Sequence, residues 1–224
     1  MIPKYKAILF DMDGVIVDSM PYHYDSWLQI FQSLGIYVDK TEIYQREGER
    51  GLVTLSEILG ANGKDLSFAD RERLLREKEI IFKKMASPRL FPGVEVLIRD
   101  LKREGYALGL VTGTSRGEID SVLPARLIRT FDVIVTGDSL ERGKPSPDPY
   151  LKAMAVLGIE PSDAMVIENA PYGIRSAKSA GIYCIAITTS LPKSYLKEAD
   201  LVCDSLEEVR SLIPGHGLGF EVSE

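Results

Sequence analysis

The chain has 224 residues, of which 45% are hydrophobic and 27% are charged; its formal net charge is -6 and its pI is near 5.2. This composition is typical of a soluble globular protein with one large domain, or with a core and a smaller insert. The acidic balance argues against nucleic acid as the main partner, and no apolar run reaches the length of a membrane span.

Two features of the sequence bear on the cellular compartment of the protein, namely its cysteines and its first residues. The cysteines, Cys184 and Cys203, do not form a CxxC pair, and a chain of this size needs no disulfide framework. We therefore expect two buried thiols in a reducing environment. The segment Met1–Lys6 has no signal-peptide pattern, so we expect a cytoplasmic protein.

The first predicted element is a buried strand over 7–10, an apolar run that breaks at Asp11. Three helical patterns follow, at 22–34, 49–59 and 68–85, and no good strand lies between about 20 and 87. Gly35 stands where the first of these helices should end, since glycine is a common helix stop.

From Phe91-Pro92-Gly93 onward, predicted helices and strands alternate. Helices are predicted at 94–104, 116–122, 148–157, 172–180 and 206–212, and strands at 107–112, 133–136, 164–167, 183–187 and 201–203. Such alternation indicates a parallel sheet with right-handed crossovers. We therefore predict an α/β fold: a doubly wound parallel core, interrupted after its first strand by a helical insert, with a loosely ordered tail at 214–224.

Polar side chains, with one glycine among them, stand at or just after the ends of four of the predicted strands. Ligands of open parallel sheets bind beyond the carboxyl ends of the strands, so these side chains are expected to share one edge. In chain order they are Asp11 and Asp13, then Thr112, Gly113 and Thr114, then Lys144, and finally Glu168 and Asn169.

These residue types fit phosphoryl transfer. Two carboxylates two residues apart on a turn can share a divalent cation, and Mg²⁺ prefers a few oxygen ligands plus water and substrate oxygens. A carboxylate can attack phosphorus, and a neighbouring carboxyl can exchange the proton of the leaving oxygen and of water. A lysine can neutralise the transferring group, and a Thr hydroxyl with the following backbone N–H groups can hold phosphate oxygens.

The same residues resemble the motifs of a known superfamily. Asp11-Met12-Asp13-Gly14-Val15 resembles the DxDGx signature of haloacid dehalogenase-like phosphohydrolases, and Thr112, Lys144 in Gly143-Lys144-Pro145 and Glu168-Asn169 resemble its second, third and fourth motifs. The resemblance implies a Rossmann-like core over 1–18 and 90–224, with an all-helical cap over 19–89. It also implies that Asp11 is the nucleophile and Asp13 the acid/base, that Thr112 holds the phosphoryl group, and that Lys144 bridges nucleophile and phosphate.

The metal site departs from the superfamily pattern. The resemblance implies Mg²⁺ bound by Asp11, by the backbone carbonyl of Asp13 and by the fourth motif, which in close relatives usually ends in two acids. Here that motif is Glu168-Asn169, and an amide offers a carbonyl oxygen without charge. We expect weaker magnesium binding than with two acids, or a cation held partly through Glu168.

Three residues of the predicted cap resemble the substrate contacts of the β-phosphoglucomutase subfamily: His23, Arg50 and Lys78. Sugar-phosphate phosphatases of that branch have similar positions. Each residue also has a structural interpretation, namely a satisfied buried histidine, a surface ion pair and a solvated charge. In the core, Arg116 follows the second motif and either reaches a distal phosphate or is simply exposed.

The sequence therefore predicts a monomeric Mg²⁺-dependent phosphatase of a small phosphorylated metabolite, such as a sugar phosphate. The alternative is a β-phosphoglucomutase, which would use the same catalytic set; Val111-Thr112-Gly113-Thr114-Ser115-Arg116 is closer to the phosphatases. Dehalogenation would not need Asp13, a receiver domain would be near half this length, and a dinucleotide-binding oxidoreductase would carry GxGxxG after the first strand.

Overall fold

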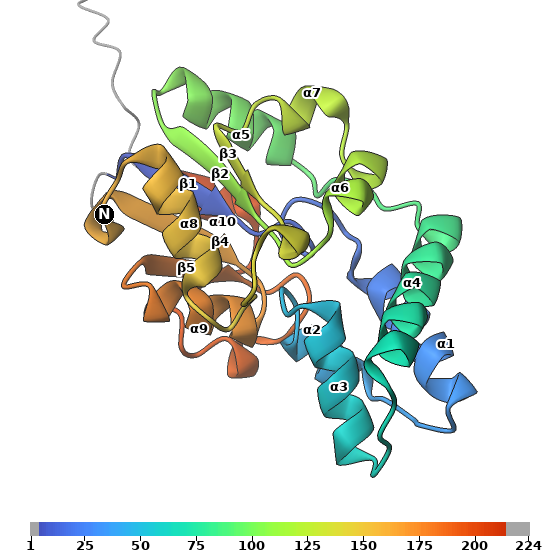
Figure 1. Cartoon of the computed structure of the whole chain (residues 1–224). Coiled ribbons are helices and arrows are strands. Elements are labelled where there is room, and N and C mark those ends of the chain that lie inside the picture. The colour runs from blue at the N-terminus through green and yellow to red at the C-terminus, as the bar shows by residue number, and fades with distance from the viewer. Residues whose placement is uncertain (1–4, 214–224) are drawn as a thin grey trace, which may run out of the picture.

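A computed structural model, which describes residues 5–213, places a six-stranded sheet at the centre of the core (Figure 1). The strands are β1 (Ala7–Phe10), β2 (Ala107–Val111), β3 (Val133–Val135), β4 (Ala164–Glu168), β5 (Tyr183–Ile187) and β6 (Leu201–Cys203). Their order is β3-β2-β1-β4-β5-β6 and every pair is parallel. The predicted doubly wound α/β fold is confirmed.

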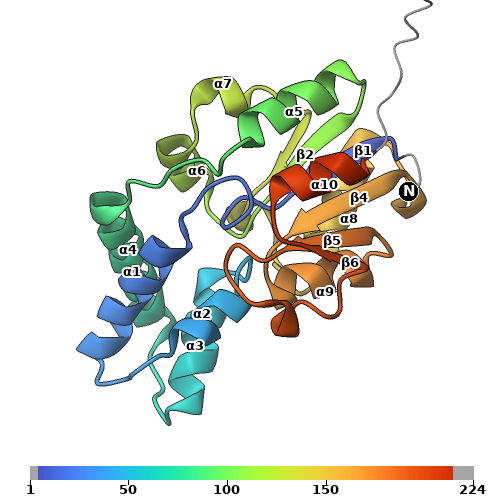
Figure 2. The ribbon, with the colours of Figure 1, turned by 180° about the vertical axis from the view of Figure 1, so that it is seen from behind.

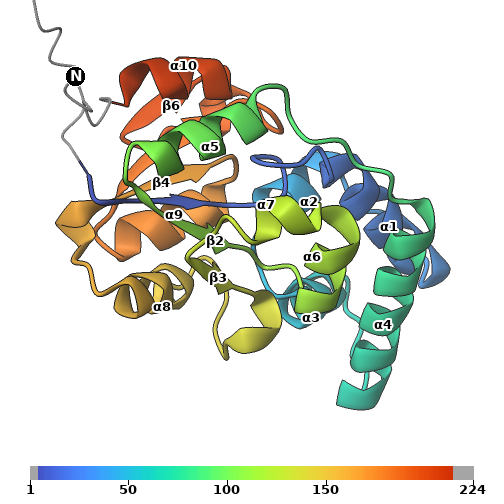
Figure 3. The ribbon, with the colours of Figure 1, turned by 90° about the horizontal axis from the view of Figure 1, so that it is seen from above.

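Helices cover both faces of this sheet, as the views from behind and from above show (Figures 2 and 3). They are α5 (Val94–Arg103), α6 (Arg116–Val122), α7 (Ala125–Ile128), α8 (Asp148–Leu157), α9 (Pro171–Ser179) and α10 (Leu206–Leu212). Apolar side chains of α5, α6, α7 and α10 pack in one core cluster, and those of α8 and α9 pack in another on the opposite face. Because both faces are covered, β1 and β4 are completely buried and read as continuous apolar runs.

The segment between β1 and α5 is helical and lies at one end of the core (Figure 1). It contains α1 (Met20–Ser33), α2 (Lys40–Gln45), α3 (Gly51–Ala61) and α4 (Phe68–Met85). These helices share a separate apolar cluster that includes Trp27, Phe31 and Leu55. We call residues 20–85 the helical segment; its division from the core as a cap domain over 19–89 stays a prediction.

Two short helices were not predicted from the sequence, α2 with six residues and α7 with four. Both are too short to show an amphipathic period, although Asp39 carries the cap signal for α2: its carboxylate accepts from the backbone N–H of Thr41 at 2.7 Å. The helix predicted from 49 begins at Gly51, because Arg50 still has extended backbone angles.

Three further expectations concern the cysteines, membrane-spanning helices and the C-terminal tail. Cys184 and Cys203 are free and buried, as predicted. None of the helices within 5–213 is long and apolar enough to cross a membrane. The tail predicted at 214–224 lies outside the described residues.

Candidate active site

The strand order reverses between β1 and β4, and this switch point positions the predicted nucleophile. The register pairs Phe10 with Ile167, and the backbone N–H of Asp11 donates to the carbonyl of Ile167 at 3.0 Å. Asp11 therefore follows β1 directly beside Glu168, the last residue of β4. Crevices at such switch points are where open α/β sheets bind ligands.

Lys144 joins these two carboxylates. Its Nζ lies 2.6 Å from Asp11 Oδ1, 2.6 Å from Glu168 Oε1 and 3.1 Å from the carbonyl of Val111. All three charged side chains are buried, and Tyr150 Oη on α8 also donates to Glu168 Oε1, at 2.7 Å. A buried lysine between two acids meets the requirement that buried charges be paired.

Burial determines the protonation of Asp11. It raises the pKa of Asp11 to about 8, although Lys144 opposes the rise; Glu168 and Asp13 add to it as neighbouring negative charges. Burial by itself would lower the pKa of Lys144, but Asp11 and Glu168 reverse that effect and raise it above its usual range. The lysine thus stays charged, while Asp11 needs further positive charge to be ionised at neutral pH.

Asp13 faces a different set of partners. Its Oδ1 accepts from Ser19 Oγ and lies 3.1 Å from His23 Nε2; its Oδ2 accepts from Thr114 Oγ1 at 2.8 Å and from Thr112 Oγ1 at 3.3 Å. Burial would raise the pKa of Asp13, but the charge and hydrogen bond of His23, with the bonds from Ser19 and Thr114, lower it to about 2. The structure therefore holds Asp13 as an ionised acceptor.

The loop after β2 is closely packed against the helical segment. A Cβ atom on Gly113 would come within 2.6 Å of the carbonyl oxygen of Gly48, so only glycine permits this approach. Thr112 Oγ1 accepts from the backbone N–H of Thr114 at 3.0 Å. The residues predicted to hold phosphate, Thr112, Gly113 and Thr114, thus lie together beside Asp13.

Two buried oxygens suit a cation. Asp11 Oδ2 and Asn169 Oδ1 have no hydrogen-bond partner, whereas Asn169 Nδ2 donates to Ser190 Oγ at 2.9 Å, which turns the amide oxygen away from the serine. Within 5–213, no cluster of three or more His, Cys, Asp or Glu side chains could hold a metal ion. The fit to Mg²⁺ therefore depends on the amide of Asn169 and on backbone carbonyls such as that of Asp13. Glu168 as a ligand stays a prediction: its Oε2 already accepts from the backbone N–H of Asn169 at 3.0 Å.

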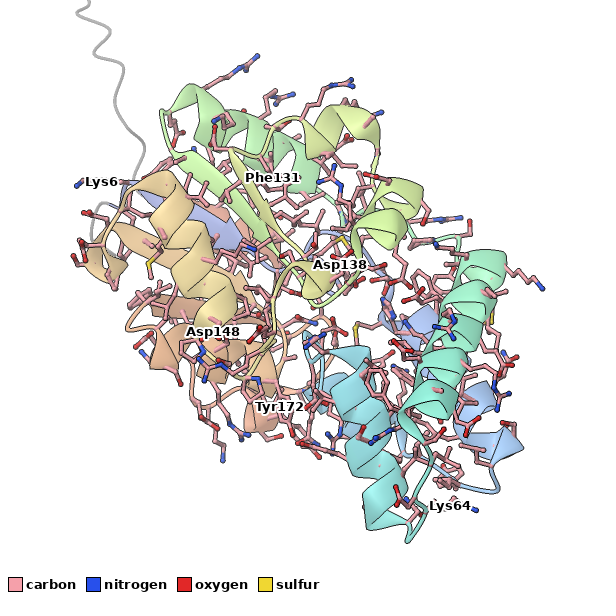
Figure 4. All side chains as sticks on the ribbon, viewed as in Figure 1. Lys6, Lys64, Phe131, Asp138, Asp148 and Tyr172 are labelled. Atoms are coloured by element: carbon pink, nitrogen blue, oxygen red, sulfur yellow. The ribbon has the colours of Figure 1, made fainter. Side chains whose placement is uncertain are left out.

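A cavity of about 170 Å³ lies between the helical segment and this edge of the sheet. The three predicted cap residues, His23, Arg50 and Lys78, all line it. In Figure 4, Asp138 marks the core wall of the cavity, in the loop after β3 that faces α3 and α4. The helical segment thus brings its polar residues to the sheet edge.

Each of these residues has a defined environment. Lys78 is 5% exposed and its Nζ lies 3.0 Å from His23 Nδ1, so the interpretation of Lys78 as a solvated charge is wrong. Arg50 makes no surface ion pair within 5–213; it donates instead to the carbonyl of Glu141 in the core. Arg116 is the exception among the predicted substrate contacts: it is exposed, pairs with Asp120 at 3.4 Å and does not line the cavity.

Sequence reasoning missed several residues of this site. Tyr150 supports Glu168 from α8, Ser19 bonds Asp13, and Glu47 and Glu118 line the cavity. Glu47 could have been found from the sequence, because it stands beside Gly48 in the segment that precedes α3. Glu118 and Tyr150 lie in helices, where only packing shows which side chains turn toward the site.

Comparisons with known proteins show which family the chain resembles along most of its length. The model of the haloacid dehalogenase-like hydrolase family matches residues 8–187. The chain is 32% identical over 211 residues to validoxylamine A 7'-phosphate phosphatase of Streptomyces hygroscopicus subsp. limoneus, covering 92% of this chain and 96% of that one. It is also 32% identical over 203 residues to beta-phosphoglucomutase of Bacillus subtilis strain 168, covering 88% of each. The crystal structure of beta-phosphoglucomutase from Clostridium difficile has a TM-score of 0.81 at 26% identity, covering 92% of this chain and 93% of that one.

Proposed function

Because the chain belongs to the haloacid dehalogenase-like hydrolase family, we propose that it is a Mg²⁺-dependent phosphatase that acts through an aspartyl-phosphate on Asp11. The observation that carries this proposal is the pair of environments around the Asp11 carboxylate. One oxygen is bonded to Lys144, and the other is buried without a partner at the switch point of the sheet. A carboxylate in this position is oriented for nucleophilic attack.

In the first step, a carboxylate oxygen of Asp11 forms a bond to phosphorus while the ester P–O bond breaks. The leaving alkoxide takes a proton from Asp13 and departs as an alcohol. Lys144, 2.6 Å from Asp11, limits the repulsion between nucleophile and phosphate. In this proposal, the backbone around Gly113 and the hydroxyls of Thr112 and Thr114, which lie beside Asp13, hold the phosphoryl oxygens.

In the second step, water attacks the phosphorus of the aspartyl-phosphate and the acyl P–O bond breaks. Asp13 takes the proton of the water, so inorganic phosphate leaves and Asp11 is restored as a carboxylate. The low pKa of Asp13 in the observed arrangement does not suit the preceding acid step. Two of its partners lie at the start of α1, Ser19 as the N-cap residue and His23 inside the helix, so movement of α1 would free Asp13 to carry a proton.

The residues that would hold Mg²⁺ are Asp11 and Asn169 through their unpartnered oxygens, with Asp13 through its backbone carbonyl and Glu168 as a further candidate. When bound, the cation would supply the positive charge that keeps Asp11 ionised and that offsets charge on the phosphoryl group. Lys144 alone serves two carboxylates, and this supports the need for a second cation.

The substrate we propose is a small phosphorylated metabolite of the sugar-phosphate type. The cavity of about 170 Å³ is smaller than the roughly 300–1,000 Å³ typical of ligand pockets. Two of the similar proteins are named validoxylamine A 7'-phosphate phosphatase and beta-phosphoglucomutase. The second name supports the alternative that this chain interconverts β-glucose 1-phosphate and glucose 6-phosphate.

Phosphorus NMR separates these two functions. The wild-type enzyme would be incubated with β-glucose 1-phosphate, Mg²⁺ and a trace of glucose 1,6-bisphosphate, and in parallel with a panel of hexose and polyol monophosphates. Inorganic phosphate as the product supports the phosphatase. Glucose 6-phosphate without free phosphate would show the mutase, and turnover that persists in excess chelator would exclude the Mg²⁺-dependent scheme.

A further inference from the structure

The charges that line the cavity are mostly negative. Five carboxyl groups line it, Glu47, Glu49, Glu79, Glu118 and Asp138, against Arg46, Arg50 and Lys78 and the imidazole of His23, which is already paired with Asp13 at 3.1 Å. The part of the substrate that extends away from the phosphoryl group must enter this space. The balance of charge there limits what that part can carry.

Two of the three Lys and Arg side chains in the lining are also paired. The guanidinium of Arg46 lies 3.2 Å from Glu49 Oε2 and 2.6 Å from Glu57 Oε2. Lys78 Nζ lies 3.7 Å from Glu118 Oε1. Arg50 is the remaining lining cation, and it already donates to a backbone carbonyl of the core.

The carboxylates are less well satisfied. Within residues 5–213, Glu47, Glu79 and Asp138 form no ion pair, although both oxygens of Asp138 accept hydrogen bonds, from Thr136 Oγ1 and from the backbone N–H of Arg116. Glu118 is only 3% exposed, and its Oε1 has no hydrogen-bond partner even though Lys78 balances part of its charge. A buried carboxylate oxygen without a donor is costly, and a donor from a ligand would satisfy it.

Glu47 lies next to the phosphate-holding loop. It is followed by Gly48, whose backbone rests against Gly113, and it lines the cavity. Burial, with Asp13 and Asp11 as nearby negative charges, raises the pKa of Glu47 well above its usual range, so Glu47 keeps a proton until a cationic donor such as an ammonium group approaches it. A group near the phosphate-bearing carbon of a substrate would therefore meet Glu47.

Resting on the proposed phosphatase function, we propose that this cavity selects phosphate monoesters whose remaining part presents hydroxyl or ammonium donors, and that it rejects those with a second phosphate. Glu47 and Glu118 are the specificity-determining residues. Donors of the substrate would bond Glu118 Oε1 and the Glu47 carboxylate. A second phosphate would face Glu79 and Asp138 with only Arg50 to balance it. The same preference favours a phosphatase over a mutase, which must accommodate a bisphosphate.

Calorimetric binding to the full-length Asp11→Asn variant with Mg²⁺ tests the selection without turnover. The probes are glucosamine 6-phosphate and fructose 1,6-bisphosphate, and we expect the amino sugar phosphate to bind at least about 10-fold more tightly. Adding Glu47→Gln or Glu118→Gln should reduce this ratio at least about fivefold. Gln at 118 can still cap α6, where Glu118 accepts from the backbone N–H of Ser115. The matched control is Glu77→Gln, an exposed acid on α4 outside the cavity lining, which should leave the ratio unchanged.

Equal or tighter binding of the bisphosphate would overturn the inference. So would a ratio that neither Glu47→Gln nor Glu118→Gln changes, or a change of equal size in Glu77→Gln. Failure of the proposed function would appear separately, because wild-type enzyme with Mg²⁺ would then release no phosphate from either probe while the binding preference persisted.

Discussion

The carboxylates at the sheet edge all have charged partners, whereas only some of the carboxylates on the cavity wall do. At the edge, Asp11 and Glu168 share Lys144, and Asp13 accepts from side chains on both of its oxygens. On the wall, Glu47 and Glu79 have no ion pair within 5–213. A completely buried charge needs a partner within the folded protein, whereas a charge beside a cavity can be paired by a bound ligand. The fold thus holds Asp11, Asp13 and Glu168 in paired positions, and within residues 5–213 it leaves Glu47 and Glu79 without ion pairs beside the cavity.

Asp11→Asn should have the largest effect, because an amide cannot attack phosphorus. Phosphate release should fall at least about 10,000-fold, the scale seen when a catalytic nucleophile is removed. Steady-state assays measure the loss, and circular dichroism checks that the variant is folded. Activity within tenfold of wild type would show that Asp11 is not the nucleophile and that the paired edge is only structural.

Lys144→Met tests whether pairing at the edge stabilises the fold. It leaves Asp11 and Glu168 buried without their shared cation, so the free energy of unfolding should fall by about 3–5 kcal/mol. Urea unfolding measures the change. The matched control is Lys193→Met, whose partner Asp204 is exposed at the surface, with an expected loss of about 0–1 kcal/mol. Equal losses in the two variants would contradict the distinction between buried and exposed pairs.

The raised pKa of Asp11 predicts a pH dependence of metal binding. Below its pKa of about 8, Asp11 holds a proton that Mg²⁺ must displace. The affinity for Mg²⁺ should therefore rise with pH and level off near pH 8, by up to about 100-fold between pH 6 and 8, since each unit below the pKa costs a factor of about ten. Calorimetry in buffers of different ionisation enthalpy would detect the released proton. An affinity that is flat over this range would show that Asp11 is already ionised without the cation.

Asn169→Asp should produce the smallest of these effects, a gain of roughly tenfold in Mg²⁺ affinity, because a carboxylate adds charge where the amide oxygen has no partner. Titration of the thermal midpoint with Mg²⁺ measures it. Asn62→Asp, an exposed change at the end of α3, is the matched control. An unchanged affinity in Asn169→Asp would place the amide outside the coordination sphere.

Most helices and strands could be predicted because the sequence patterns that indicate them are local. The bounds of α4, α8, α10, β5 and β6 agree with the predictions, since long periodic patterns and buried apolar runs need no distant information. The short helix α2 was missed because six residues show no period, and α3 began two residues later than predicted because Arg50 keeps an extended backbone.

The sequence by itself determined which residues follow the strands: Asp11, Asp13, Thr112, Lys144 and Glu168 share one edge because parallel strands end on the same side of a sheet. Only the tertiary structure decided their partners and charge states. Asp13 meets His23 and Thr114, Glu168 meets Tyr150, and Arg116 points elsewhere, because contacts between residues far apart in the chain depend on how the helical segment and the core pack. Burial and neighbouring charge then set each pKa, and neither can be read along the chain.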